Sequence, residues 1–129
     1  MGWETRREQR HPIVVQITVQ VNPSMQETIH LAKETFQGQL VDISLHGLGL
    51  VSHTFLPKGV LVDLELPRSI LSLPGKPPAS GTMKITGQIV YTKSEGGQCR
   101  MGLVIIHIEE KDRLLIQEFS LAQQRRQGN

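Results

Sequence analysis

The chain has 129 residues, of which 38% are hydrophobic and 20% charged, and a formal net charge of +2. This composition excludes a disordered polymer and fits one domain with one core. The small net charge also argues against general binding to a nucleic-acid polymer or a membrane, so an anion site must come from local clustering of charge.

One cysteine and a polar start limit the compartments in which the chain is expected. Cys99 has no partner for an intrachain disulfide, and we favour a small buried hydrophobe over a reactive thiol. Residues 1–12 contain no apolar run of a secretory signal, and no stretch reaches the roughly twenty apolar residues of a membrane span. We therefore expect a cytoplasmic protein with no membrane span.

The first part of the chain predicts a polar arm followed by a strand. Residues 1–11 are expected to form a flexible arm, and residues 12–126 a single domain. Apolar side chains at every odd position in 13–21 predict a half-buried strand. Residues 24–35 leave both a short helix and a second extended segment open.

The middle of the chain predicts short strands separated by turns. In the segment 36–44, Val41 and Ile43 are expected on one face of a strand, with Asp42 and Ser44 on the other. Further strands are expected at 48–51, 60–66, 84–91 and 98–108. The expected connections are a turn at 45–47, a loop at 55–59, a long proline-rich loop at 67–81 that holds a helical turn at 69–73, and a hairpin turn at 94–97.

From Glu109 the apolar pattern changes to that of a helix. The expected buried stripe consists of Leu114, Leu115, Phe119, Leu121 and Ala122. Short strands followed by one terminal helix predict an all-β fold, a six-stranded antiparallel β-barrel with a C-terminal α-helix packed on it.

Three arginines lie in the predicted arm, at Arg6, Arg7 and Arg10. A guanidinium group binds phosphate through two parallel, charge-assisted hydrogen bonds, and its flat face stacks on purine rings. Arginines four residues apart on an arm can grip one ligand from two sides. Taken alone, the same residues also fit a solvated tail.

A second polar group stands at the end of the predicted strand 36–44. Asp42 can accept hydrogen bonds from a guanine edge, and Ser44 can bond a phosphate or a base. Gly47 permits a positive φ and lets a ligand approach the backbone. Taken alone, the group also fits an ordinary polar strand end before a tight turn.

Together these elements resemble the PilZ domain family, a bacterial receptor domain for cyclic di-GMP. Its signature is an Arg-x-x-x-Arg arm followed by Asp/Asn-x-Ser-x-x-Gly, which Arg6 to Arg10 and Asp42 to Gly47 match in order and separation. The run after Gly47, the late hairpin with Gly102 on its return strand and the final helix extend the resemblance to the end of the chain.

The resemblance implies a ligand-binding role for eight residues. The arm would wrap over the ligand, with phosphate and guanine contacts from the arginines and a guanine edge read by the carboxylate and hydroxyl. Tyr91 stands roughly where some members stack an aromatic ring on a base, although its parity with Ile89 favours the core. The implied site residues are Arg6, Arg7, Arg10, Asp42, Ser44, Gly47, Tyr91 and Gly102.

Several features differ from a minimal member of this family. The connection at 22–35 and the loop at 67–81 are long, and Thr5 stands where members that bind a stacked ligand dimer often carry a basic residue. The stoichiometry of the ligand therefore stays open.

The function expected is a cyclic di-GMP-binding signalling module. Its arginine arm would become ordered on the ligand and relay this to an unidentified effector protein. The alternative is an adaptor of the same fold that does not bind the nucleotide. No catalytic arrangement and no metal-ligand spacing stand out, so we expect neither an enzyme nor a metal protein, and no cofactor besides the ligand.

Overall fold

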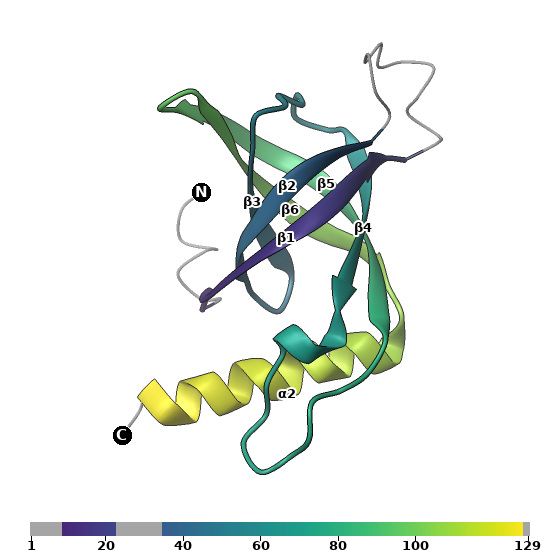
Figure 1. The fold of residues 1–129 in the computed structure, drawn as a ribbon, viewed down its shortest axis with the longest axis vertical. Coiled ribbons are helices and arrows are strands. Elements are labelled where there is room, and N and C mark those ends of the chain that lie inside the picture. The colour runs from purple at the N-terminus through teal and green to yellow at the C-terminus, as the bar shows by residue number, and fades with distance from the viewer. Residues whose placement is uncertain (1–8, 23–34, 128–129) are drawn as a thin grey trace.

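The structure is a computed structural model that describes residues 9–22 and 35–127. Six strands are followed by one helix, with a short 3-10 turn between the fourth and fifth strands (Figure 1). The elements are β1 (His11–Val21), β2 (Thr35–Ile43), β3 (Gly47–Ser52), β4 (Leu61–Pro67), η2 (Arg68–Ile70), β5 (Thr82–Glu95), β6 (Gln98–Ile108) and α2 (Glu110–Gln127).

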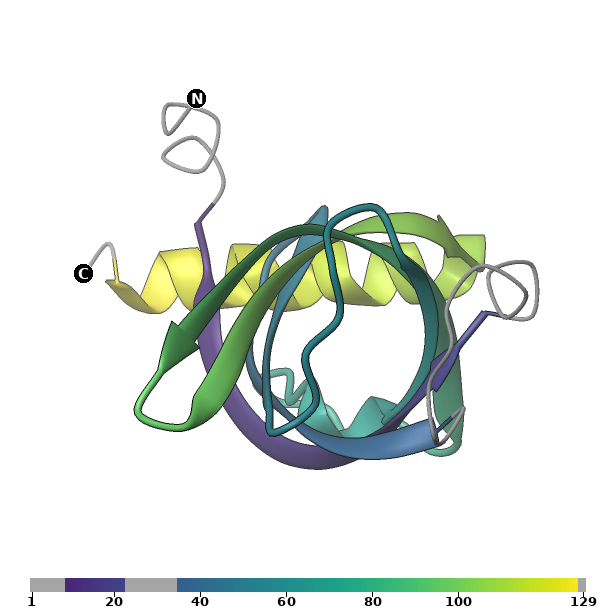
Figure 2. The ribbon, with the colours of Figure 1, turned by 90° about the horizontal axis from the view of Figure 1, so that it is seen from above.

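The strands form a closed antiparallel barrel in the order β1-β2-β3-β6-β5-β4. Figure 2 looks through the barrel and shows α2 lying across it. Closure depends on β1 and β4, which pair over three residues only, from Val19 opposite Leu64 to Val21 opposite Val62. The predicted six-stranded barrel with a C-terminal helix is therefore confirmed.

The barrel interior is filled by aliphatic side chains from alternate strand positions, because successive side chains of a strand point to opposite faces. β4 shows the pattern most plainly, since Val62, Leu64 and Leu66 are fully buried between more exposed neighbours. Cys99 is buried in the same core, as expected. The largest fully buried side chains are Leu40, Ile43, Leu48, Leu50, Leu56, Leu64, Leu66, Leu71, Met83, Ile85, Ile89 and Met101.

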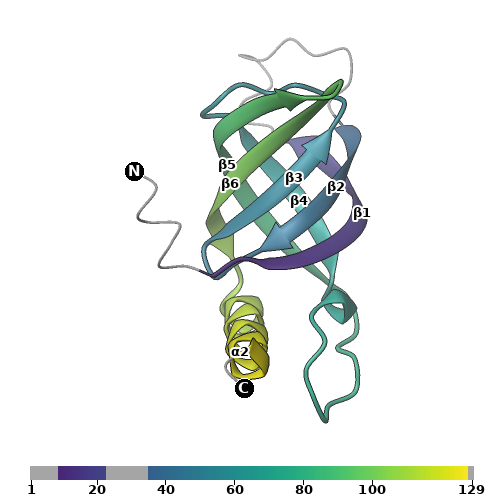
Figure 3. The same ribbon diagram turned by 90° about the vertical axis from the view of Figure 1, so that its left-hand side faces the viewer.

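The helix α2 covers one end of the barrel, beside the loop that follows η2 (Figures 1 and 3). Ile116 and Phe119 are buried against the core, as are the polar side chains of Asp112 and Ser120. Asp112 accepts hydrogen bonds from Arg68 at 2.7 and 3.3 Å. The Arg68 N–H also donates to the Gly81 carbonyl at 2.9 Å, so Arg68 joins both ends of the 67–81 loop to the helix.

The predicted apolar stripe of the helix is partly wrong. Leu114 and Leu121 are 46% and 44% exposed, while Asp112 and Ser120 are buried. The stripe was inferred from apolar residues alone, and here two polar side chains take buried positions because each has a hydrogen-bond partner on the barrel side.

The other expected boundaries differ little from the structure. The helical turn expected at 69–73 lies slightly earlier, at Arg68–Ile70, and the hairpin turn after β5 holds Gly96 and Gly97 at positive φ. β1 starts at His11, which the sequence assigned to the arm. Of the ambiguous segment 24–35, only Thr35 lies within the described residues, and it begins β2.

Candidate functional site

Three charged side chains meet on the outside of the barrel at β2. Arg10, just before β1, donates to Asp42 Oδ1 at 2.8 Å, and Arg100 of β6 donates to Asp42 Oδ2 at 3.1 Å. The Asp42 side chain is 13% exposed, against 36% and 38% for the two arginines. These three side chains together carry one net positive charge, because one carboxylate pairs with two guanidinium groups.

Two glycines form the floor next to this ion-pair cluster. Gly49 of β3 pairs with Asp42 on one side and with Gly102 of β6 on the other, and Gly102 pairs with Tyr91 of β5. A Cβ atom on Gly49 would lie 2.7 Å from both Asp42 carboxylate oxygens, and one on Gly102 would lie 2.3 Å from the Tyr91 ring. Both side chains therefore lie flat across the sheet, over positions that only glycine can occupy.

Tyr91 lies on the surface and not in the core, which corrects the orientation expected from its parity. The ladder between β5 and β6 shifts between Ile89 and Tyr91, so the strand gains one residue there. Ile89 stays buried, while Tyr91 is 41% exposed and covers Gly102. A β-bulge of this kind redirects the side chains that follow it.

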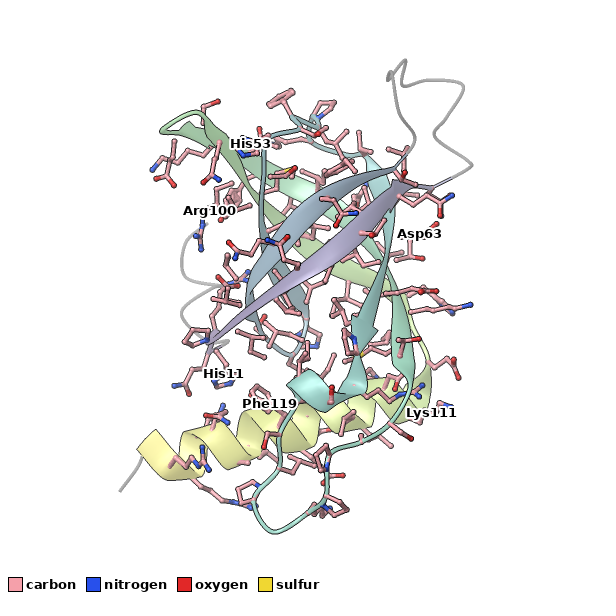
Figure 4. All side chains as sticks on the ribbon, in the orientation of Figure 1. His11, His53, Asp63, Arg100, Lys111 and Phe119 are labelled. Atoms are coloured by element: carbon pink, nitrogen blue, oxygen red, sulfur yellow. The ribbon has the colours of Figure 1, made fainter. Side chains whose placement is uncertain are left out.

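Tyr91 also supports the arginine of β6. Its hydroxyl, as a hydrogen-bond partner, raises the pKa of Arg100, and the negative charges of Asp42 and Glu95 raise it further, against the opposing effect of burial. Arg100 is charged at any physiological pH. Figure 4 shows it projecting from the outer wall of the barrel.

The turn from β2 to β3 is closed by Ser44, whose hydroxyl was expected on the outward face. Ser44 is buried in this turn, and its hydroxyl accepts from the Gly47 N–H at 3.1 Å and lies 3.3 Å from the Gly47 carbonyl. Earlier in the strand, a bulge between Leu40 and Asp42 shifts the parity of β2. Leu40, and not Val41, consequently shares the interior with Ile43.

Gly47 is required by close packing and not by its backbone angle. Its φ is not positive, contrary to the use expected from the sequence. A Cβ atom there would lie 2.9 Å from the Leu103 carbonyl oxygen and 3.2 Å from a terminal nitrogen of Arg10. The turn therefore lies directly beneath the Arg10 side chain.

Most residues predicted from the sequence come together on this face. Arg10, Asp42, Ser44, Gly47, Tyr91 and Gly102 surround one patch of β1, β2, β3, β5 and β6, while Arg6 and Arg7 lie outside the described residues. Sequence reasoning missed Arg100 and Gly49. Arg100 stands two residues before Gly102, which places both on the same face of β6, and Gly49 alternates with buried leucines.

The patch is separate from a hollow on another part of the surface. That hollow, of about 810 Å³, lies along β1, β4 and β5 and shares no lining residue with the patch. Among the described residues, no three His, Cys, Asp or Glu side chains are arranged as metal ligands. In the same part of the chain, no helix is long and apolar enough to cross a membrane.

A family model supports the resemblance that the arginine and aspartate motifs suggested. The model of the PilZ domain matches residues 4–122, which cover both motifs, the barrel and most of α2. The chain belongs to the PilZ domain family. No curated protein matches the chain.

Solved structures share this fold at low sequence identity. The inhibitor of motility MotI/DgrA of Bacillus subtilis has a TM-score of 0.65 at 16% identity, over 92% of this chain and 51% of its own. YcgR of Escherichia coli in complex with c-di-GMP has a TM-score of 0.58 at 19% identity, over 95% of this chain and 48% of its own. The chain thus spans about half the length of these two proteins.

The isolated PilZ domain of YcgR provides a comparison of similar length. Its structure with c-di-GMP has a TM-score of 0.57 at 16% identity, and the match covers 94% of this chain and 92% of that domain. These likenesses establish the barrel and its terminal helix for this PilZ chain.

Proposed function

We propose that this PilZ domain binds cyclic di-GMP on the patch around Asp42. The observation that carries the proposal is the Asp42 carboxylate held between two arginines, beside a floor of two glycines and a tyrosine ring. Guanine presents two adjacent N–H donors on its edge, and a carboxylate can accept both. The excess guanidinium charge suits the two phosphates of the ligand.

Binding then proceeds by an exchange of ion pairs. The guanine edge takes the carboxylate oxygens, and Arg10 and Arg100 turn from Asp42 to the phosphates and the base faces. Arg6 and Arg7 add phosphate contacts from the arm. Because each arginine leaves one anion for another, the exchange leaves no buried charge without a partner.

The remaining predicted residues shape this surface. The glycine floor at Gly49 and Gly102 lets a purine approach the sheet, and Tyr91 borders it with an exposed aromatic ring. Ser44 fastens the turn above which Arg10 lies, and contact of its hydroxyl with the ligand stays a prediction.

The proposed role is signalling and not catalysis. The ligand would order the arginine arm on the barrel and so create a surface for an effector protein. A cytoplasmic location and a bacterial source are part of this proposal. The rival function is an adaptor of the same fold that binds its partner without the nucleotide.

Isothermal titration of the full chain tests the proposal. We expect saturable heat with cyclic di-GMP and none with cyclic di-AMP, because adenine presents an acceptor where guanine presents its N1–H donor. Equal binding of both ligands would mean that only phosphates are recognised. No heat with either would refute nucleotide binding and favour the adaptor.

A further inference from the structure

A second concave surface lies between the C-terminal half of α2 and the loop after η2. Figure 3 looks along α2 and shows this loop beside it. The groove between them has a volume of about 460 Å³. It is lined by Leu73, Pro74, Lys76, Glu118, Leu121, Ala122, Arg125 and Arg126.

The lining combines apolar side chains with an excess of positive charge. Leu121 is 44% exposed and lines the groove together with Leu73 and Pro74 of the loop. Lys76 pairs with Glu118 at 3.1 Å, which neutralises one cation. Within the part of the chain that the structure describes, neither Arg125 nor Arg126 has a carboxylate within ion-pair distance.

Both walls of the groove are held in place by the core. Leu71, at the start of the loop, is 2% exposed, and Phe119 of the helix is 5% exposed. Arg68 joins the two walls through Asp112 and also donates to the Ser80 carbonyl at the far end of the loop. A partner entering a groove that is already formed loses little free energy to ordering it.

We propose that this groove docks an amphipathic helical segment of a partner protein, with apolar residues on one stripe and carboxylates beside it. The apolar stripe would cover Leu121 and the loop, and the carboxylates would pair with Arg125 and Arg126. The proposal does not need the nucleotide to bind, so it can fail while the proposed function holds, and the reverse.

Two other occupants fit the groove less well. A second copy of the chain in a two-fold contact would bring the same basic surfaces together, which is repulsive. A membrane surface would require apolar side chains that protrude, whereas Leu73, Pro74 and Ala122 line a hollow.

A titration of the isotope-labelled full chain, followed by amide chemical shifts, tests the docking. The probe is a synthetic 18-residue helical peptide with leucines at i, i+3, i+4 and i+7 and glutamates flanking them. We expect saturable shifts confined to 71–80 and 118–126, and a Kd about tenfold weaker for the variant R125E/R126E. The variant K58E/K111E carries the same charge change elsewhere and should bind as the parent does.

Several results would overturn the proposal. The first two are the absence of amide chemical-shift changes at millimolar peptide, and changes centred outside the groove. The other two are a Kd that K58E/K111E weakens as much as R125E/R126E does, and equal binding of a peptide that carries lysine in place of glutamate. Sedimentation with anionic vesicles is the remaining arm. Vesicle binding that R125E/R126E abolishes, without peptide binding, would assign the surface to a membrane and refute protein docking.

Discussion

Replacing Asp42 by asparagine separates the two roles of this carboxylate, one in the free domain and one in the complex. In the free domain Asp42 makes two ion pairs with arginines that are each more than one-third exposed, so each pair contributes about 0.5 kcal/mol. D42N should therefore lower the free energy of unfolding by about 1 kcal/mol. For a domain of this size, Tm should fall by about 4 °C.

The effect on the ligand should be larger. Each guanine N–H bond to a charged acceptor contributes about 2 kcal/mol, and asparagine keeps one acceptor but presents an NH₂ group to the second donor. A loss of about 3 kcal/mol is offset by about 1 kcal/mol of ion pairs that the ligand no longer has to break. The net loss of about 2 kcal/mol makes binding about 30-fold weaker.

Titration calorimetry and thermal unfolding of the same samples measure both numbers. D63N is the matched control, because Asp63 is also an exterior carboxylate that accepts hydrogen bonds, from Asn22 and Thr86. Figure 4 shows it on another part of the barrel. An affinity within twofold of the parent, together with the expected loss in Tm, would show that Asp42 is structural only and would refute the guanine contact.

Three further outcomes are expected. Burial lowers the pKa of His11, so below about pH 6.5 the unfolded chain binds more protons than the folded chain does. The free energy of unfolding, measured by urea titration, should therefore fall as the pH drops from 7 to 5, and it should fall less steeply in H11F. F119A should lose about 3–4 kcal/mol and L114A less than about 0.5 kcal/mol in the same assay, since only Phe119 is buried; equal losses would contradict the observed helix face. R100A should weaken cyclic di-GMP binding about tenfold, whereas R113A should not, and tighter binding by R100A would mean that Arg100 only competes for Asp42.

Strand count, strand order along the chain and the terminal helix could be predicted because they depend on the period of apolar residues. β4 is the clearest case, with buried side chains at each second position. The two signature motifs were also visible, since Arg10 and Asp42 are defined by residue type and spacing. In space they form a direct ion pair across 32 residues of sequence.

The contacts of the helix α2 could not be read from its apolar residues. His11 contacts Phe119 edge-on with ring centroids 5.7 Å apart, and its Nε2 lies 3.0 Å from the Ser120 hydroxyl, as Figure 4 shows for the two rings. This contact between a buried serine and a buried histidine forms only in three dimensions, and it leaves His11 Nδ1 without a hydrogen-bond partner among the described residues. No local pattern in either segment indicates which partner the other will be.

Val41 and Tyr91, whose predicted orientation was wrong, both lie next to irregular ladders. Register shifts occur between Pro12 and Val15, between Leu40 and Asp42, and between Ile89 and Tyr91. A period-two argument assumes an unbroken ladder, so it assigns residues on the two sides of a shift to the wrong faces relative to each other.

These shifts also explain why the patch exists. The bulge in β2 lets Leu40 and Ile43 both enter the core while Asp42 stays on the outside, opposite Gly49. The bulge in β5 turns Tyr91 out over Gly102. A regular barrel of the same length would bury the tyrosine, so the departures from strand periodicity create the surface on which a nucleotide can lie.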